Sequence, residues 1–223
     1  MSIDPITVEV IKGALTYAAE EMGIVLRNSA YSPNIKERMD FSCTIFDHKK
    51  RLAAQAEHIP VHLGSMQLAV QKSLEKFKGK LENGDMILFN DPYISGTHLP
   101  DITLICPIFH EGKIIAYSAN KAHHSDIGGK APGSMAGDAT EIYQEGIIIP
   151  PVKFVKKNVI DEEVAGILLS NVRTPEIRMG DLRAQMAANI LGKRRILELV
   201  DRYGTETLHK AMEEIMNYSE RRM

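Results

Sequence analysis

The sequence contains no tryptophan, few other aromatic residues and almost no net charge. Aromatic residues make up 6% of the 223 residues, which argues against a stacking surface for bases or sugars. The 27 basic and 29 acidic side chains leave a formal net charge of −2, so no broad attraction to nucleic acid or anionic lipid is expected. We therefore expect neither nucleic acid nor a membrane among the partners.

Cysteine is also scarce, and long apolar runs are missing. Cys43 and Cys106 are too few for a disulfide framework and lie in apolar, strand-like runs, so we expect buried free thiols rather than redox or metal-binding groups. No run approaches the roughly 20 apolar residues that span a bilayer, and the start MSIDPITVEV lacks the features of a secretion signal. These absences predict a cytoplasmic protein.

The familiar nucleotide and serine-nucleophile motifs are absent as well. The sequence contains no GxxxxGK[ST], no GxGxxG and no GxSxG. Nucleotide binding by this chain and serine hydrolysis therefore have no support. What is present is an ordinary globular composition, 44% hydrophobic and 25% charged, at a length that suits one large domain or two small ones.

The N-terminal segment predicts a long amphipathic helix. Asp4 is a suitable cap, and Pro5 suits the first helical position. Apolar residues then recur three and four positions apart, which indicates one buried stripe. The predicted stripe consists of Ile11, Leu15, Ala18, Met22 and Val25.

The middle of the chain predicts strands, and the end predicts helices. The expected elements are a strand, turn and strand at 41–55, a helix at 63–77, a strand ending at Asn90, a hairpin of 102–109 with 114–123, a glycine-rich loop at 125–138, a strand at 145–157 and helices thereafter. Pro107 predicts an edge strand or a bulge. We expect an α/β fold of the mixed α+β kind, an antiparallel or mixed sheet (1–158) followed by a helical region (159–223). The helical region would pack on the sheet or on a partner chain.

The stretch THLPD places two good metal ligands, His98 and Asp101, around a proline. Pro100 restricts the backbone, so the two side chains are held before any metal binds. In the predicted hairpin, paired residues have numbers that sum to about 223 or 224, which sets Asp101 opposite Ala122 or His123. Only a loop with an odd number of residues would put Asp101 and His123 on one face. The sequence does not choose between these registers.

Two imidazoles and a carboxylate at one point are a ligand set for Zn, Mn or Fe(II). The alternative is that His98 and Asp101 cap a strand while His123 is a buried structural residue. Of the polar residues nearby, His124 and Asp126 are the candidates for a general base or for orienting the ligands. Pro60 lies between His58 and His62, so we expect these two to be pocket or loop residues, with a metal role as the alternative, whereas His48, His110 and His209 are expected in turns or at the surface.

Five blocks, in order, resemble the hydantoinase B family. They are RMDFSCTIFD, EHIPVHLGSM, NDPYISGTHLPDITLICPIF, KAHHSDIGGKAPGSM and EIYQEGIIIPPVK. The family includes N-methylhydantoinase B, the C-terminal part of 5-oxoprolinase and the large subunits of acetone and acetophenone carboxylases. The resemblance implies a divalent metal held by Asp40, His98, Asp101 and His123, the first of these corresponding to the aspartate of the RMDFS block.

The resemblance also implies an activity and partners. It indicates one subunit of an ATP-dependent cyclic amidohydrolase, in which a metal-bound water attacks a phosphate-activated ring amide. A hydantoinase A-like subunit would use the ATP in a hetero-oligomer. The alternatives are a subunit of an ATP-dependent ketone carboxylase and a non-catalytic assembly subunit. Family members are usually more than twice this length, so another chain is expected to supply a missing C-terminal portion.

Overall fold

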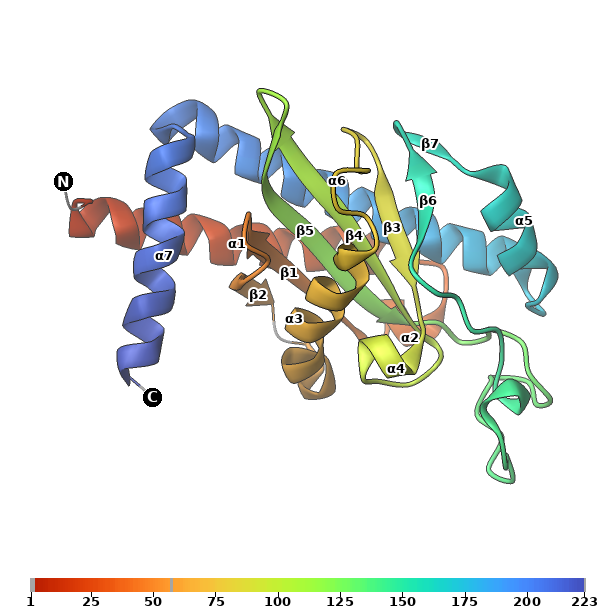
Figure 1. The fold of residues 1–223 in the computed structure, drawn as a ribbon. Helices are drawn as coiled ribbons and strands as arrows, with labels where there is room; N and C mark the ends of the chain where they lie inside the picture. The colour runs from red at the N-terminus through yellow and green to blue at the C-terminus, as the bar shows by residue number, and fades with distance from the viewer. Residues whose placement is uncertain (1–2, 57, 223) are drawn as a thin grey trace.

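The protein is built around one antiparallel sheet with helices on both faces (Figure 1). The structure is a computed structural model that describes residues 3–56 and 58–222. The strands are β1 (Phe41–Asp47), β2 (Leu52–Ala56), β3 (Met86–Phe89), β4 (Asp101–His110), β5 (Lys113–His123), β6 (Val152–Lys156) and β7 (Val159–Ile160). They pair in the order β2-β1-β5-β4-β3-β6-β7, all antiparallel, which confirms the predicted fold class.

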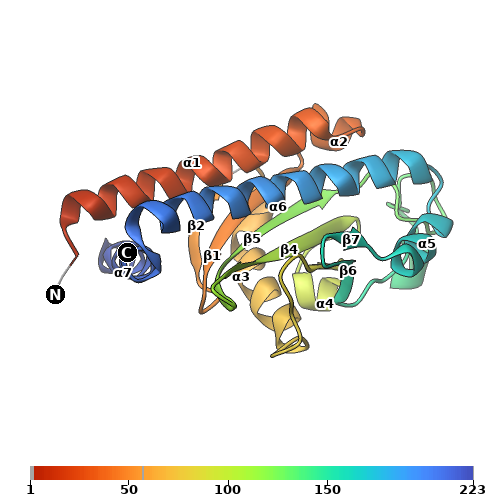
Figure 2. The same ribbon diagram turned by 90° about the horizontal axis from the view of Figure 1, so that it is seen from above.

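The helices form a layer on each face of the sheet (Figure 2). They are α1 (Pro5–Ser29), α2 (Pro33–Lys36), α3 (Pro60–Glu75), α4 (Pro92–Ser95), α5 (Glu162–Ser170), α6 (Pro175–Tyr203) and α7 (Thr205–Arg222), with a short 3-10 helix at Ile142–Gln144. Helices α1 and α6 lie side by side on one face, and α3 and α4 lie on the other. No helix in the described part of the chain is long and apolar enough to cross a bilayer.

Helix α1 follows the sequence prediction closely. The Asp4 carboxylate accepts a hydrogen bond from Thr7 N at 3.0 Å, and Pro5 is the first helical residue. Of the predicted stripe, only Val25 is not fully buried, since Leu26 takes the buried position there. The predicted thiols Cys43 and Cys106 are buried and free, and burial raises the pKa of each.

The β4–β5 hairpin contains a two-residue turn followed by a bulge. Glu111 and Gly112 both have positive φ, 49° and 75°, as a tight type I′ turn requires. Next to the turn the paired residue numbers sum to 223, as in His110 with Lys113, but a register shift beyond Phe109 changes the sum to 224. The bulge therefore sets the register at the far end of the hairpin, and the odd-length loop considered from the sequence is not what produces it.

The edge-strand alternative predicted for Pro107 is wrong, because β4 lies in the interior of the sheet between β5 and β3. The bulge alternative is nearly correct, because the register shift lies between Ile108 and Phe109, directly after Pro107 and its neighbour. Strand β3 pairs with β4 only from Thr103 to Ile105, so Pro107 lies beyond the stretch that β3 covers. A residue without a backbone N–H is tolerated there because no ladder hydrogen bond to β3 is needed.

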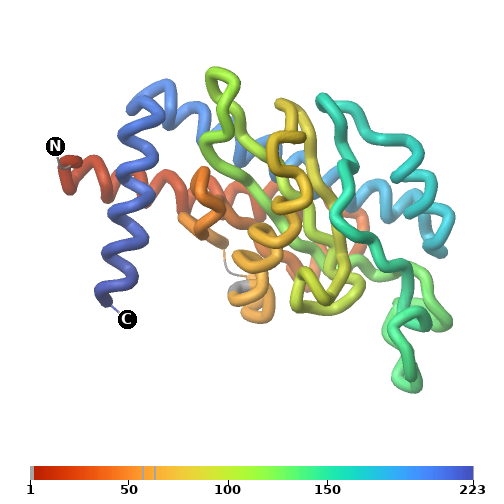
Figure 3. The backbone as a smooth tube through the Cα atoms, viewed as in Figure 1, coloured from red at the N-terminus to blue at the C-terminus, as the bar shows by residue number. Residues whose placement is uncertain are grey.

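The helices after residue 158 pack on the sheet of the preceding region. Residues of α6 and α7, such as Ile196 and Met212, share a hydrophobic cluster with Ile11 of α1 and Ile45 of β1. Figure 3 shows α6 running beside α1 along the sheet, with α7 crossing near the N-terminal end of α1. The division at residues 158 and 159 falls between the paired strands β6 and β7. Helices α6 and α7 thus pack on elements of the preceding region.

The buried face of α6 carries a row of polar side chains beside its apolar residues. Four of them are fully buried and recur three or four positions apart: Arg178, Asp181, Gln185 and Asn189. Each bonds to another segment. The Asp181 carboxylate accepts from the backbone N–H groups of Tyr31 and Ser32 at 2.8 and 3.0 Å, and from Arg178 at 3.0 Å. Buried polar groups bonded across segments in this way favour one packing arrangement, although Arg178 Nε and Asn189 Oδ1 have no partner among the described residues.

Replacing Asp181 by Ala is expected to destabilise the fold strongly. The change leaves the buried Arg178 guanidinium and two backbone N–H groups without their acceptor, and breaking a buried pair costs about 3 to 5 kcal/mol. Denaturant unfolding measures this loss. The control is Arg183→Ala, an exposed residue two positions further along the same helix, which should change the free energy of unfolding by less than about 0.5 kcal/mol. Equal stabilities of the two variants would show that the buried network contributes little.

Candidate metal centre

The register of the β4–β5 hairpin places Asp101 directly opposite His123. Alternation along the strands puts both side chains on the face covered by α3 and α4, while Ala122 and His124 point to the α6 face. Asp40 precedes β1, the neighbour of β5 on the other side, and its carbonyl accepts from His123 N at 2.9 Å. His98 lies in the loop between α4 and β4. Four segments thus bring the predicted ligands to one corner of the sheet.

Three of the four predicted ligands form a tight cluster. One potential ligand atom from each of His98, Asp101 and His123 lies within 4.8 Å of the others. The Asp101 carboxylate is 2.7 Å from Nδ1 of His123 and 3.3 Å from Nδ1 of His98. The two imidazole rings meet edge to face with 5.8 Å between their centroids. The structure therefore joins residues that are 25 positions apart in the chain.

The loop that carries His98 is stiff for local reasons. Asp91 caps α4 through Tyr93 N, and Gly96 ends this helix in the left-handed region at φ 67°. Two hydrogen bonds close the turn that contains Pro100: His98 N donates to the Asp101 carboxylate and Asp101 N donates to His98 O, both at 3.0 Å. The backbone around His98 is thus fixed by the neighbouring ligand.

The electrostatics of the pair favour a charged carboxylate. Burial raises the pKa of Asp101, but the hydrogen bond and the charge of His123 outweigh it and hold this pKa at about 2. Conversely, burial lowers the pKa of His123, and the bond to Asp101 outweighs that effect, so the net shift is upward. The lowered pKa of Asp101 and the raised pKa of His123 both indicate that Asp101 is ionised at neutral pH, which is the form that binds a cation.

Asp40 faces the same corner without belonging to the tight cluster. Burial raises the pKa of its carboxyl, and the charges of His123, Asp101 and His98 also act on it. Its side chain is half-buried. The structure places Asp40 beside the other three predicted ligands, within electrostatic reach but outside the 4.8 Å group.

Two buried residues at this corner were not predicted from the sequence. His62 of α3 has Nε2 3.8 Å from the Asp101 carboxylate, while its Nδ1 is 3.1 Å from the Ser42 hydroxyl. Burial lowers the pKa of His62 to about 4, so it is neutral, and that of Lys121 to about 8. Lys121 lies two positions before His123 on β5, and this period-2 spacing was the signal that would have found it. The proline of AEHIPVH begins α3, so His58 and His62 do not share a helix.

The contacts of His124 are those of a structural residue. Its side chain lies on the α6 face, fully buried, with Nε2 2.9 Å from Gln185 Oε1. Because the Gln185 amide nitrogen already donates to Ile102 O and Asn120 Oδ1, the Gln185 oxygen is the acceptor and His124 carries its proton on Nε2. Burial lowers the pKa of His124 to about 4. A catalytic role for this residue stays a prediction that these contacts do not favour.

Asp126 organises the glycine-rich loop rather than the ligand cluster. Its carboxylate accepts from the backbone N–H groups of Gly128 and Gly133 at 3.0 and 3.2 Å, and pairs with Arg173 at 2.9 Å. The Arg173 guanidinium also donates to carbonyl groups of this loop, among them Gly129 O at 2.7 Å. The catalytic role predicted for Asp126 therefore gains no support from its contacts.

The residues present fit a divalent metal. Two imidazole nitrogens and one carboxylate, with Asp40 near, are a donor set that Zn, Mn and Fe(II) accept. The His98 side chain is 56% exposed while that of Asp101 is fully buried, so the cluster opens to the surface on the side of His98. A small molecule can therefore approach the cluster from that side.

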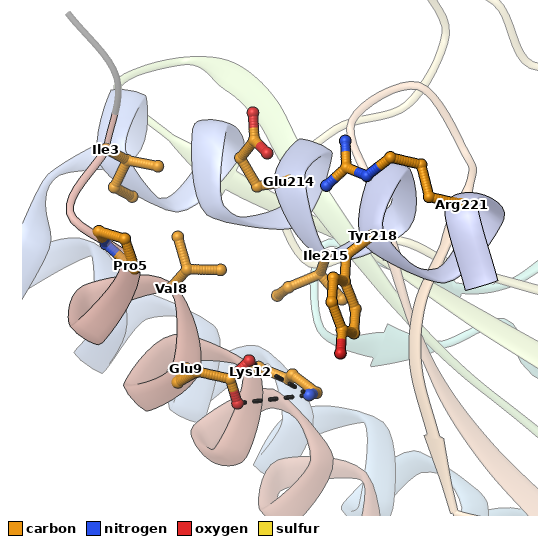
Figure 4. A pocket seen from close by; sticks show the side chains of 9 residues that line it. All are labelled: Ile3, Pro5, Val8, Glu9, Lys12, Glu214, Ile215, Tyr218 and Arg221. Atoms are coloured by element: carbon orange, nitrogen blue, oxygen red, sulfur yellow. Dashed lines mark hydrogen bonds and ion pairs between the residues drawn. The ribbon is translucent and has the colours of Figure 1, made fainter.

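A groove elsewhere is not connected with these residues. It lies between the start of α1 and α7, has a volume of about 330 Å³ and is lined mainly by apolar side chains, as Figure 4 shows. The Lys12 ammonium, 3.3 Å from Glu9, lies at one side of it. None of the four predicted ligands lines this groove.

Comparison with known proteins decides the family. Residues 4–223 match the family described as Hydantoinase B/oxoprolinase. The chain belongs to this family. It is 41% identical to the 5-oxoprolinase of Saccharomyces cerevisiae over 95% of the chain and 17% of the relative. The resemblance inferred from the five sequence blocks is thereby confirmed.

Solved structures support the same relationship. The crystal structure of the ATP-dependent caprolactamase from Pseudomonas jessenii matches with a TM-score of 0.95 at 36% identity, over all of this chain and 38% of that one. A nucleotide-free acetone carboxylase matches with a TM-score of 0.89 over 95% of this chain and 28% of that one, and its 24% identity shows a shared fold alone. The chain spans between 16% and 39% of the length of the curated relatives it matches.

Replacing Asp126 by Ala is expected to loosen the glycine-rich loop. The change removes the acceptor of two loop N–H groups and the partner of Arg173, so limited proteolysis should cleave within residues 127–140 at least several times faster. Asp138→Ala is the matched control, because this aspartate lies in the same loop and its carboxylate pairs only with an exposed Lys130. Equal cleavage of both variants and the unchanged chain would contradict this role for Asp126.

Proposed function

We propose that this chain is the metal-bearing part of an ATP-dependent enzyme that opens a cyclic amide of the hydantoin, oxoproline or lactam type. The observation that carries the proposal is the cluster of His98, Asp101 and His123 at an accessible corner of the sheet. Membership of the hydantoinase B/oxoprolinase family supports it, as does the likeness to 5-oxoprolinase and to an ATP-dependent caprolactamase. Caprolactam and 5-oxoproline are both cyclic amides.

The residues of the cluster have separate tasks in this proposal. His98, Asp101 and His123, with Asp40 as a fourth ligand, would hold Zn, Mn or Fe. A bound metal would supply Lewis-acid chemistry, polarising a carbonyl or lowering the pKa of water. The Asp101 carboxylate, kept ionised beside His123, provides the negative charge that attracts the cation. His62, whose Nδ1 is 3.1 Å from the Ser42 hydroxyl, lies on the buried side of that carboxylate with Nε2 3.8 Å away.

ATP would be used by another subunit, a hydantoinase A-like ATPase in a hetero-oligomer. The sequence contains neither of the glycine-rich nucleotide motifs sought in it, and the similar caprolactamase chain is described as subunit beta. A partner that phosphorylates the ring carbonyl would deliver an activated substrate to the cluster. Because the chain spans 38% of that subunit, a further portion would complete the substrate pocket.

Metal content tests the proposal directly. The protein, isolated without chelator and with the subunits that accompany it, should contain on the order of one divalent ion per chain by elemental analysis. His98→Ala and Asp101→Ala should each lose most of this metal and the amidohydrolase activity, because each removes a donor. Circular dichroism should stay close to that of the unchanged protein, since the substitutions lie at a loop and a strand end.

His110→Ala is the control for this experiment. His110 ends β4 at the opposite end of the hairpin, so its removal should leave metal content and activity unchanged. If the unchanged protein carries no metal and binds none on titration, the chain is instead a non-catalytic assembly subunit.

A ketone carboxylase is the second candidate, favoured only by the shared fold with acetone carboxylase. In such an enzyme the phosphate-activated substrate is an enol directed onto carbon dioxide or bicarbonate. Incubation with ATP, labelled bicarbonate and either a cyclic amide or a ketone separates the two. We expect ring opening without incorporation of label. Label in an acidic product formed from a ketone would reverse the assignment.

A further inference from the structure

The ammonium of Lys121 is buried among groups of the loop that carries His98. Its Nζ donates to Ser95 O at 3.2 Å and to Thr97 Oγ1 at 3.0 Å, on either side of Gly96. A third bond, 3.0 Å long, goes to the Ser65 hydroxyl of α3. One side chain of β5 thus ties the His98 loop and α3 to the centre of the sheet.

Other contacts hold the part of this loop that follows His98: Asn90 Nδ2 donates to Leu99 O at 2.8 Å, His124 N donates to Pro100 O at 3.0 Å, and Leu99 is buried. The bonds from Lys121 restrain the part that precedes His98. The His98 side chain is 56% exposed, so burial does not hold it in place. Within the loop, the hydrogen bonds from His98 N to Asp101 and from Asp101 N to His98 O are local, and they fix the shape of the turn rather than its position over the sheet. The bonds from Lys121 act across segments, because they connect the loop to the strand that also carries His123.

The bond to Thr97 brings the Lys121 ammonium to the residue directly before His98. The Thr97 hydroxyl accepts from Lys121 Nζ at 3.0 Å, and two positions earlier Ser95 O accepts at 3.2 Å. Both acceptors lie within three positions of His98, so these bonds hold the segment that leads into a predicted ligand.

We propose that Lys121 is a positioning residue that holds the His98 loop against β5 and so brings His98 to Asp101 and His123. The inference rests on the proposed function for its metal-binding consequence, but the tie itself exists without metal. A buried ammonium with three oxygen partners has no reason to lie at this corner for packing alone, since an apolar side chain would avoid its desolvation cost. Its placement indicates that the loop is held by charge-assisted hydrogen bonds.

The first test is hydrogen exchange of the metal-free protein, isolated with its accompanying subunits. Lys121→Met removes the donors while keeping the length of the side chain. Amides in residues 92–101 should then exchange about tenfold faster or more, because charge-assisted bonds that closed the loop are lost. Lys113→Met, on the same strand but exposed at the turn, should leave this segment unchanged.

The second test is the dissociation constant for Zn²⁺, measured by competition with a chromophoric chelator. Residues that orient metal ligands typically change metal affinity by about 10- to 100-fold, and Lys121→Met should weaken binding within that range. A matched pair of threonine variants covers the case in which Lys121→Met does not fold. Thr97→Val should weaken Zn²⁺ binding, whereas Thr103→Val, next to Lys121 on β4, should not.

Unchanged exchange of residues 92–101 in folded Lys121→Met overturns the proposal, and so does unchanged Zn²⁺ affinity in both Lys121→Met and Thr97→Val. Failure of the unsubstituted protein to bind Zn²⁺, Mn²⁺ or Fe²⁺ counts against the proposed function. It leaves the exchange experiment as the decisive test of the tie.

Discussion

The pairing of β4 with β5 is the constraint on which the rest of the corner depends. It places Asp101 across from His123, and the resulting 2.7 Å contact is the shortest within the cluster. Asp40 and His98 then join from the two flanking segments, the start of β1 and the loop before β4. A shift of one residue in this pairing would turn Asp101 and His123 to opposite faces of the sheet. No local stiffness of the THLPD turn could compensate for that.

The bulge near Phe109 controls this pairing from the opposite end of the hairpin. The tight turn at Glu111 and Gly112 starts the ladder in one register, and the extra residue on β5, Ile115, moves it to the other. The sequence predicted the hairpin, its turn region and the two possible registers. It could not choose between them, because the choice is made by a single residue that leaves the ladder without altering the apolar pattern. Pro107, which lies close to the bulge, was the nearest signal in the sequence. It indicates an irregular strand because proline has no backbone N–H to donate to a neighbouring strand.

The two faces of β5 carry different groups of polar residues: predicted ligands on one face and residues that bond to α6 on the other. Lys121 and His123 point toward α3 and α4, where the predicted ligands gather. Asn120 and His124 point toward α6, where Gln185 bonds to both. His124 was predicted at the site as one of the polar residues near the same end of the hairpin, but adjacent residues of an extended strand face opposite ways. The buried polar row of α6 was not predicted, because the sequence indicated only that the chain after residue 158 is helical and not which side of the helix is buried.

The cluster is open on the side of His98, and the family relatives are much longer than this chain. In the proposed function the sheet corner would provide the metal ligands, and other parts of the assembly would line the substrate pocket and bind ATP. Anomalous diffraction from crystals of the protein grown with Mn²⁺ or Zn²⁺ tests the central claim most directly. The account predicts one strong peak at the metal edge, about 2.0 to 2.2 Å from donor atoms of His98, Asp101 and His123. A peak only at other residues, or His98 and His123 turned away from a shared centre, would contradict it.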